Sequence, residues 1–428
     1  MKIYKVNYLI SSNGKTIGAN IRDSLSNNSF NIRKEEFLLY KGQFENAIVT
    51  SNGIIRAKKG NLRIIDTKEL LNTQNRKHKK VNCYILMYRD LAVLTLSISN
   101  NTVTIHNKNF IPFSLRGRQK ITAENIKYWI EQRISNINRT YMNLVYIARD
   151  VGRDNTKVIK DSCGISFTDQ YWISTSDINI TWQRLQELRD INTGLNDVAL
   201  RGKLDLALDL KSGYTTLFST KGYFPKAIYD GWLYKRAEDS LLEYPAYLIG
   251  KHLGISISEV KILDKYIGIK LFTSDKFSLI HASELKEYYN SDDELYNIMY
   301  AIGRTDIAFQ MQRMFIYNFI IGNPDLHEDN YGCIYDADTF DIISLSPCYD
   351  HNVAFQEGFN GLSRGRLSGS SILTLDEYTK QFILGHQDIV SKLRSINILF
   401  EELNNYLTDR QMRELKCRIN AVIQWGTA

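Results

Sequence analysis

The chain has 428 residues, of which 43% are hydrophobic and 24% charged, and its formal net charge is +7. It contains only 5 prolines, so its composition is that of a globular protein and argues against extended disorder. The longest apolar run, at residues 314–321, is too short to cross a membrane, and the first residues lack the apolar segment of a signal peptide. We therefore expect a cytoplasmic protein with no membrane span.

The charge is distributed unevenly along the chain. Residues 1–150 contain 25 Lys and Arg against 10 Asp and Glu, a balance of +15, whereas the remainder contains 29 against 37, a balance of −8. Basic residues gather at 56–80, in the runs RAKK and NRKHKK. They indicate either a surface for nucleic acid or an acidic protein, or a positive face that docks on the acidic C-terminal part. No zinc-finger or aromatic-studded pattern accompanies the charge, which favours the second interpretation.

The first 175 residues predict short strands and one clear helix. Residues 81–88 and 91–99 are typical of a strand pair joined by the short turn Arg89-Asp90. Thr122 is a suitable N-cap, and the apolar spacing after it predicts a helix to about residue 133. Two more strands are expected at 165–168 and 171–174.

Residues 200–275 predict a small lobe. The pattern is a strand at 215–220, a glycine-containing loop at 219–226, strands at 227–229 and 231–235, and a helix at 243–252 that ends before a glycine. The loop has one glycine rather than three, so by itself it indicates only a hairpin turn.

Lys235 lies among apolar residues on the last of these strands. A lysine on the buried side of a strand needs an anion, and a nucleotide phosphate is the natural one. Glu243, eight residues later, is expected to orient the lysine from the following helix, and Glu238 is a rival for this role.

Beyond residue 285 the pattern is mostly helical. Helices are expected at 294–303, 306–321, 375–384, 388–403 and 408–425, and a hairpin at 331–343. A β-rich lobe followed by a helical lobe predicts an α+β fold of the bilobal protein-kinase type. We expect three parts, namely a basic α+β region for substrate, partner or regulation at 1–160, a kinase N-lobe at 161–272 and a helical C-lobe at 273–428.

The strongest functional signal lies between residues 323 and 350. Asp325 follows a helix end, Asn330 comes five residues later, and Asp350 comes twenty residues after that. A phosphotransferase needs such a set, because one carboxylate receives the proton of the attacking hydroxyl while an amide and a second carboxylate hold Mg²⁺ against the nucleotide phosphates. The hairpin between Asn330 and Asp350 returns the chain and is expected to bring these two side chains together.

These segments resemble the HipA-like family of bacterial serine/threonine kinases over roughly residues 210–355. GYFPK at 222–226 is similar to the family's phosphate loop, and WLYK at 232–235 to its strand with the ATP lysine. The helix at 243–255 and the segment IKLF at 269–272 are similar to its glutamate-headed helix and its adenine-contacting hinge. Residues 323–330 and 347–350 are similar to its catalytic and metal segments.

The resemblance implies a role for each matching residue. Asp325 is the general base, and the other expected catalytic residues are Lys235, Asn330 and His327, of which His327 supports the loop and contacts nucleotide. Magnesium is bound by Asn330 and Asp350. ATP is bound by Gly222, Pro225, Lys226, Lys235, Glu243, Lys270, Leu271, Phe272, His327, Tyr349 and Asp350. Ser219, with Thr220 as an alternative, falls where family members carry a serine whose autophosphorylation ejects the phosphate loop and inactivates the kinase.

Two departures from the family pattern concern partners and substrate. Residues 1–150 do not resemble the short N-terminal subdomain of the family, so toxin behaviour and pairing with a DNA-binding antitoxin need not transfer. Asp329 stands in the catalytic loop where family members often carry a basic residue.

The sequence therefore predicts an ATP- and Mg²⁺-dependent kinase acting on a protein serine or threonine. Two alternatives stay open. One is a kinase for a small molecule or lipid headgroup, because the same geometry serves any hydroxyl acceptor. The other is a nucleotide-sensing module that binds nucleic acid through residues 56–80.

Overall fold

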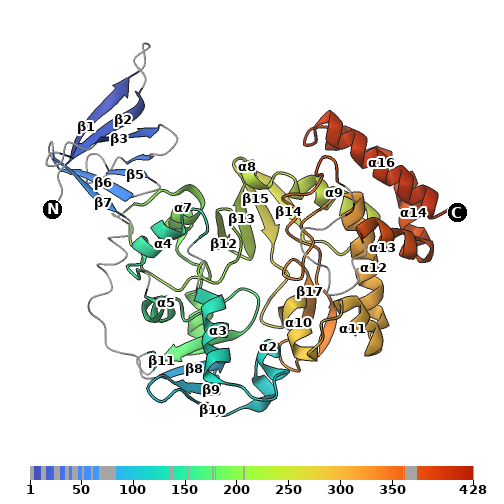
Figure 1. The fold of residues 1–428 in the computed structure, drawn as a ribbon, viewed down its shortest axis with the longest axis horizontal. Coiled ribbons are helices and arrows are strands. Elements are labelled where there is room, and N and C mark those ends of the chain that lie inside the picture. The colour runs from blue at the N-terminus through green and yellow to red at the C-terminus, as the bar shows by residue number, and fades with distance from the viewer. Residues whose placement is uncertain are drawn as a thin grey trace.

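The computed structural model of the chain has a mixed α+β fold, as the sequence predicted (Figure 1). It describes residues 83–134, 138–152, 154–175, 178, 180–205, 208–359, 361 and 374–427, together with the backbone of seven strands between residues 4 and 66. In the described part of the chain, no helix is long and apolar enough to cross a membrane.

The first seven strands form one antiparallel sheet with the order β3-β2-β1-β7-β6-β5-β4. The side chains of residues 56–80 lie outside the described residues, so the expected nucleic-acid surface there stays a prediction. The strands are β1 (Tyr4–Ile10), β2 (Thr16–Asp23), β3 (Ser29–Arg33), β4 (Leu38–Tyr40), β5 (Ala47–Thr50), β6 (Gly53–Lys58) and β7 (Asn61–Asp66).

A second antiparallel sheet has the order β10-β9-β8-β11. It contains the predicted strand pair, β8 (Cys83–Tyr88) and β9 (Leu91–Ser97), with β10 (Thr102–Ile105) and β11 (Tyr171–Thr175). Thus β8 and β11, on either side of the domain boundary expected at residue 160, are neighbours in one sheet.

Around this sheet, one predicted element is confirmed and another is wrong. The helix after Thr122 is confirmed as α3 (Ala123–Ile134). The strand expected at 165–168 is wrong. The Ser166 hydroxyl bonds to the Thr168 hydroxyl at 2.7 Å and accepts the backbone N–H of Thr168 at 3.2 Å, and these local bonds bend the chain. The other elements of this part are η3 (Lys108–Phe110), α2 (Phe113–Arg116), α4 (Met142–Ala148), α5 (Asn155–Ser162), α6 (Trp182–Glu187) and α7 (Thr193–Arg201).

The third sheet, β12-β13-β15-β14, belongs to the expected small lobe. Its strands are β12 (Lys226–Tyr229), β13 (Trp232–Arg236), β14 (Val260–Leu263) and β15 (Tyr266–Lys270), with α8 (Ala237–Ser240) and α9 (Glu243–Leu253) between β13 and β14. The strand expected at 215–220 is wrong. The hydroxyls of Ser219 and Thr220 both donate to the Thr216 carbonyl, at 2.9 and 2.8 Å, and hold the segment in a turn.

The C-terminal part is helical around a three-stranded sheet, as expected. The sheet contains β16 (Phe277–His281), β17 (Gly332–Asp336) and β18 (Ile342–Leu345), and β17 with β18 is the predicted hairpin. The single helix expected at 388–403 is wrong, because the chain turns at Ser395, whose hydroxyl bonds back to the Lys392 carbonyl at 3.0 Å. The helices are α10 (Ala282–Tyr289), α11 (Leu295–Ala301), α12 (Thr305–Ile320), α13 (Leu375–Phe382), η4 (Ile383–Gly385), α14 (Gln387–Arg394), η5 (Ile396–Leu399), α15 (Phe400–Leu403) and α16 (Asp409–Trp425).

The second sheet docks on the β17–β18 hairpin. The Tyr88 hydroxyl donates to the Ala337 carbonyl, and the Tyr88 ring lies 5.1 Å from the ring of Phe340. Arg89 pairs with Asp338 beside this contact. Residues 83–110 therefore pack against the C-terminal part through aromatic rings and an ion pair. The basic runs at 56–80 lie outside the described side chains, so docking of that positive face stays a prediction.

Candidate active site

Lys235 on β13 lies at the centre of a buried ion-pair network. Its ammonium donates to Glu243 Oε1 and to Asp350 Oδ1, each at 2.6 Å, and the residue is 2% exposed. Burial alone would lower the pKa of Lys235, but the attraction of Asp350 and Glu243 outweighs it and raises the pKa above its usual range. Lys235 is therefore a fixed positive charge between two carboxylates.

Glu243 is held at the start of α9 by a second contact. Its Oε2 accepts the backbone N–H of His351 at 2.8 Å, which ties the helix to the residue after Asp350. Burial would raise the pKa of Glu243, but Lys235 and His351 lower it, so the group stays a carboxylate. The rival Glu238 instead pairs with Arg236 at 2.7 Å. The structure thus brings Lys235 and Glu243 together as the sequence predicted.

The loop with Asp325 is built on the carboxyl end of α12. The amide of Asn323 donates to Asn318 Oδ1 at 2.8 Å, and both residues are buried. Asn323 Oδ1 in turn accepts the backbone N–H of Asp325 at 3.1 Å. A chain of amides from a buried helix therefore sets the backbone of the expected general base.

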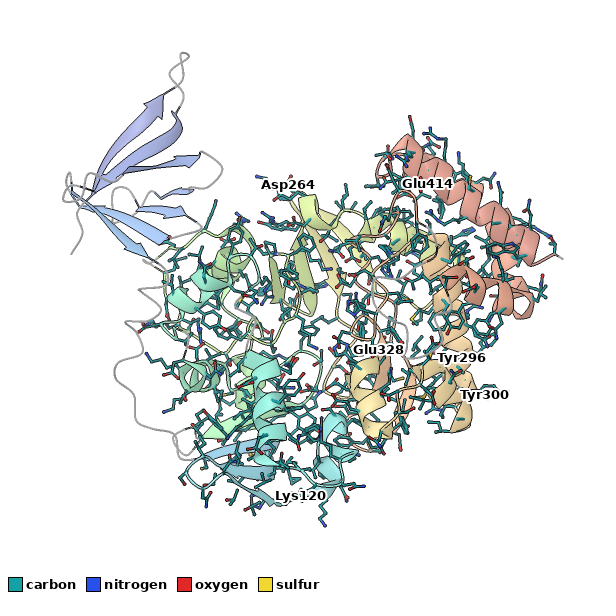
Figure 2. The ribbon with its side chains drawn as sticks, in the orientation of Figure 1. Lys120, Asp264, Tyr296, Tyr300, Glu328 and Glu414 are labelled. Atoms are coloured by element: carbon teal, nitrogen blue, oxygen red, sulfur yellow. The ribbon has the colours of Figure 1, made fainter. Side chains whose placement is uncertain are left out.

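Asn330 turns back onto Asp325. Its Nδ2 donates to the Asp325 carbonyl at 2.8 Å and lies 3.4 Å from Oδ2 of the same residue. His327 closes the loop, since its carbonyl accepts the N–H of Asn330 at 2.7 Å and its Nδ1 accepts that of Asp329 at 3.2 Å. Glu328, labelled in Figure 2, anchors the same loop to α10 by accepting from Lys286 at 2.7 Å. These contacts fit the loop-supporting role expected of His327.

The β17–β18 hairpin returns the chain to this loop. The N–H of Ser346 donates to the Gly332 carbonyl at 2.8 Å, so the strand that leads to Asp350 leaves beside the strand that follows Asn330. Asp350 has a left-handed backbone with φ of 63°, which is uncommon outside glycine and typical of functional sites. Burial would raise the pKa of Asp350, but Lys235 and Lys226 hold it well below its usual range. The group therefore carries a negative charge.

The expected adenine-side residues are brought together in part. The rings of Phe272 and Tyr349 lie 5.6 Å apart, and the Tyr349 hydroxyl bonds to His281 Nδ1 at 3.2 Å. The backbone N–H of Leu271 donates to the Gly231 carbonyl at 2.9 Å. The side chain of Lys270 is 57% exposed and lies 3.4 Å from Glu259, so its ammonium already has a carboxylate partner.

The loop at 219–226 closes on a buried lysine. Lys226 Nζ donates to the Lys221 carbonyl at 2.7 Å, and Lys226 is 7% exposed. Gly222 has φ of 96°, a left-handed backbone that favours glycine, and a Cβ there would lie 2.8 Å from Lys226 Nζ, so a larger residue would also displace the lysine ammonium. Burial lowers the pKa of Lys226 to about 7. Pro225 is buried next to Lys226, at the end of the loop.

One contact that the sequence did not predict joins this loop to the catalytic loop. Lys221 Nζ lies 3.5 Å from Asp329 Oδ1, and the Ser283 hydroxyl donates to the same oxygen at 2.7 Å. The side chains of Lys221 and Asp329 are 55% and 42% exposed, so the pair is solvated. Asp329 was visible in the sequence as a departure from the family pattern, but its partner was not.

The expected metal ligands fit magnesium by their donor type. In the described part of the chain, no group of three or more His, Cys, Asp or Glu residues is placed to hold a metal ion. Mg²⁺ is usually bound through one or two protein groups together with substrate phosphates, so the oxygens of Asn330 and Asp350 suffice for such a site.

Comparison with known proteins gives matches among solved structures alone. No family model and no curated protein matches the sequence. HipA of Shewanella oneidensis MR-1, solved with HipB and operator DNA, matches with a TM-score of 0.50 and 12% identity, over 80% of this chain and 96% of that one. The proinflammatory kinase CtkA of Helicobacter pylori matches with a TM-score of 0.35 and 15% identity, over 47% and 92%. The likeness to HipA shows that the chain has the HipA-like fold, as its motifs predicted.

Proposed function

We propose that the protein is an ATP- and Mg²⁺-dependent serine/threonine protein kinase of the HipA-like type. The observation that carries the proposal is the Lys235 ammonium, held by Glu243 and Asp350 at 2.6 Å each. Asp350 is also an expected magnesium ligand, so the lysine and the metal would act on the same phosphates. Phosphoryl transfer asks mainly for such positioning and charge neutralisation.

Each residue then has a defined task. Asp325 accepts the proton of the acceptor hydroxyl at Oδ2, and the Asn330 amide orients this carboxylate from 3.4 Å. Lys235 and Lys226 bind phosphate oxygens. Asn330 and Asp350 hold Mg²⁺, which when bound neutralises charge on the phosphates. Phe272 and Tyr349 line the adenine side.

Ser219 is the proposed autophosphorylation site. It is partly exposed, whereas the neighbouring Thr220 is 3% exposed, so Ser219 is the more accessible of the two hydroxyls. Both donate to the Thr216 carbonyl, and phosphorylation would remove that bond from the loop.

An antitoxin is the proposed partner. The supporting observation is the likeness to Shewanella HipA, a toxin–antitoxin protein solved with HipB and operator DNA. Residues 1–160 would recruit the protein substrate or this partner.

The test is incubation of the purified protein with labelled ATP and Mg²⁺, with Asp325→Ala and Ser219→Ala in parallel. We expect label on the wild type, none on Asp325→Ala, and loss of the self-label on Ser219→Ala while added protein substrate is still labelled. Lysate proteins and small hydroxylated acceptors are offered side by side to identify the acceptor class. A wild type that neither transfers label nor binds ATP with Mg²⁺ would remove the kinase proposal.

A further inference from the structure

Four arginines are buried in the described part of the chain, and three of them have a carboxylate partner. Arg133 pairs with Asp169 at 2.7 Å, Arg149 with Asp161 at 2.8 Å, and Arg418 approaches Glu414 at 3.8 Å. The fourth is Arg139, 3% exposed, for which no acidic partner is found among the described residues. A buried guanidinium without an anion is costly, so its position requires an explanation.

Arg139 lies against the phosphate loop. Its Nη2 donates to the Leu217 carbonyl and contacts Met142 Sδ at 3.2 Å. The next residue, Thr140, donates its backbone N–H to the Tyr223 carbonyl at 3.0 Å. Two adjacent residues from outside the expected kinase N-lobe therefore hold this segment, Thr140 within the loop at Tyr223 and Arg139 at Leu217, two residues before the loop begins.

The backbone two residues after Arg139 has an uncommon conformation. Tyr141, the N-cap of α4, has a left-handed φ of 66°, an unusual conformation for a bulky residue. Its ring is seated over Gly202, where an added Cβ would lie 2.8 Å from the ring carbons. Packing of the Tyr141 ring thus stabilises a left-handed backbone that a bulky residue usually avoids. Tyr141 directly follows Thr140, which contacts the phosphate loop.

A second nitrogen of Arg139, Nη1, is buried and has no hydrogen-bond partner in the described part of the chain. Lys226 is a buried cation on the loop itself. Its ammonium donates to the Lys221 carbonyl, and among the described residues no carboxylate lies at ion-pair distance from it. The positive charge of Arg139 contributes to lowering the pKa of Lys226, and that of Lys226 to lowering the pKa of Asp350, so these charges share one neighbourhood.

We propose that Arg139 is a phosphate-binding residue of the nucleotide site, contributed by the segment between α3 and α4. Nη2 holds the turn before the loop through Leu217, and Nη1 is left for a phosphate oxygen of the nucleotide. The ligand class is a nucleoside polyphosphate, because two buried cations, Lys226 on a glycine-containing loop and Arg139 beside it, match phosphate rather than carboxylate or base. This inference rests on the proposed kinase function and adds a residue to its site.

The test compares binding of ATP, ADP and adenosine, each with Mg²⁺, to the wild type and to Arg139→Met and Arg139→Lys. We expect Arg139→Met to lower the affinity for ATP by at least about tenfold and the affinity for adenosine by less than about twofold, with the loss for ADP between them. A hydrogen bond to a charged group contributes on this scale. Arg139→Lys keeps the charge and should recover part of the ATP affinity.

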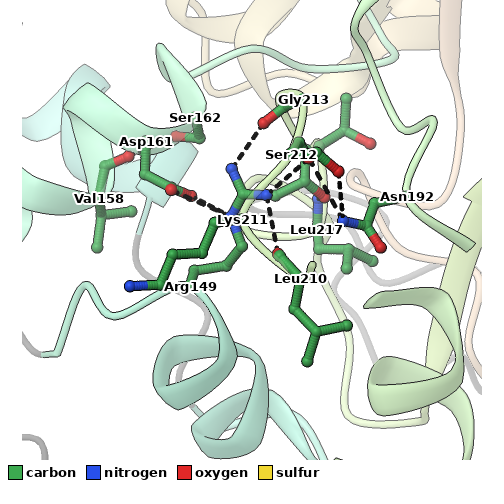
Figure 3. A network of polar contacts seen from close by, with 12 residues as sticks. Arg149, Val158, Asp161, Ser162, Asn192, Leu210, Lys211, Ser212, Gly213 and Leu217 are labelled. Carbon is green, nitrogen blue, oxygen red and sulfur yellow. Dashed lines mark hydrogen bonds and ion pairs between the residues drawn. The ribbon is translucent and has the colours of Figure 1, made fainter. Parts of the chain in front are cut away.

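Arg149 provides the matched control. It is also buried and also holds loop carbonyls, those of Leu210, Ser212 and Gly213 at 2.7–3.1 Å, but Asp161 neutralises its charge (Figure 3). Arg149→Met should therefore leave the ratio of ATP to adenosine affinity at its wild-type value, even where it lowers stability.

The outcomes distinguish a failure of the proposed role of Arg139 from a failure of the proposed kinase function. Equal losses for ATP and adenosine in Arg139→Met, or no loss for either, would overturn the inference, because Arg139 would then serve packing alone. If Arg139→Met does not fold, the same comparison is made with Arg139→Lys. The lysine ammonium cannot occupy the position of Nη1, so this variant should still change the affinity for ATP more than that for adenosine. A wild type that binds neither ATP nor ADP would instead count against the kinase function itself.

Discussion

Lys226 is expected to make nucleotide binding depend on pH. Burial lowers the pKa of its ammonium from an ordinary 10.5 to about 7 in the nucleotide-free protein. Bound phosphates favour the charged form and raise this pKa, so affinity is greatest where Lys226 is already protonated and falls as the pH rises above 7.

The size of the effect follows from proton linkage. If the pKa returns to its ordinary value on binding, ATP should bind about 15-fold more weakly at pH 8.5 than at pH 7, and the full shift corresponds to about 5 kcal/mol. Among the charged neighbours, Asp350, Glu243 and Lys235 do not titrate in this range, because the pKa values of the two carboxyls are lowered and that of the ammonium is raised. Burial lowers the pKa of Arg139 to about 9, so this group begins to titrate only at the upper end of the range. Binding should also take up a proton near pH 8.

The assay is isothermal titration of ATP with Mg²⁺ between pH 6.5 and 9, in buffers of different ionisation enthalpy, for the wild type and Lys226→Arg. The arginine stays charged throughout, so it reports the titration of the nucleotide and the metal alone. A wild-type profile that parallels that of Lys226→Arg, with no extra proton uptake, would show that Lys226 does not titrate as argued.

Four further variants test the site. Asp325→Asn should lower phosphoryl transfer by about 10²–10⁴-fold in single-turnover assays, with ATP affinity nearly unchanged, because it removes the proton acceptor and no phosphate contact. Glu243→Ala should lower the free energy of unfolding by about 3–5 kcal/mol in denaturant titrations, because it leaves a buried ammonium with one partner, and wild-type stability would contradict the buried pair. Lys221→Ala and Asp329→Asn should each change the free energy of unfolding by less than about 1 kcal/mol, since both side chains are solvated. A larger loss would show that the contact is shielded from water.

Much of the site was predictable because its chemistry is local in sequence. Asp325, Asn330 and the hairpin that follows lie within one short stretch, and the helix that begins at Glu243 starts only eight residues after Lys235. Spacing alone then indicates which groups meet, since a hairpin must return and a helix must end where proline and glycine interrupt it. The Lys235–Glu243 contact at 2.6 Å follows from such reasoning.

The two strands that were wrongly expected lie in segments where side-chain hydrogen bonds compete with pairing of the backbone. Residues 165–168 and 215–220 have the apolar and β-branched residues typical of strands, but their hydroxyls bond to the local backbone or to each other. The energy difference between such a turn and an edge strand is small, so local pattern does not decide it.

From the sequence we could predict many of the helices and strands, the α+β fold and the proximity of Lys235 and Glu243, because these depend on periodicity and on residues close together in the chain. Only the tertiary structure shows which groups from distant segments meet. Arg139 donates to the carbonyl of Leu217, 78 residues away, and Lys221 meets Asp329 across two loops. Such contacts depend on how separate elements pack, and no spacing within either segment records them.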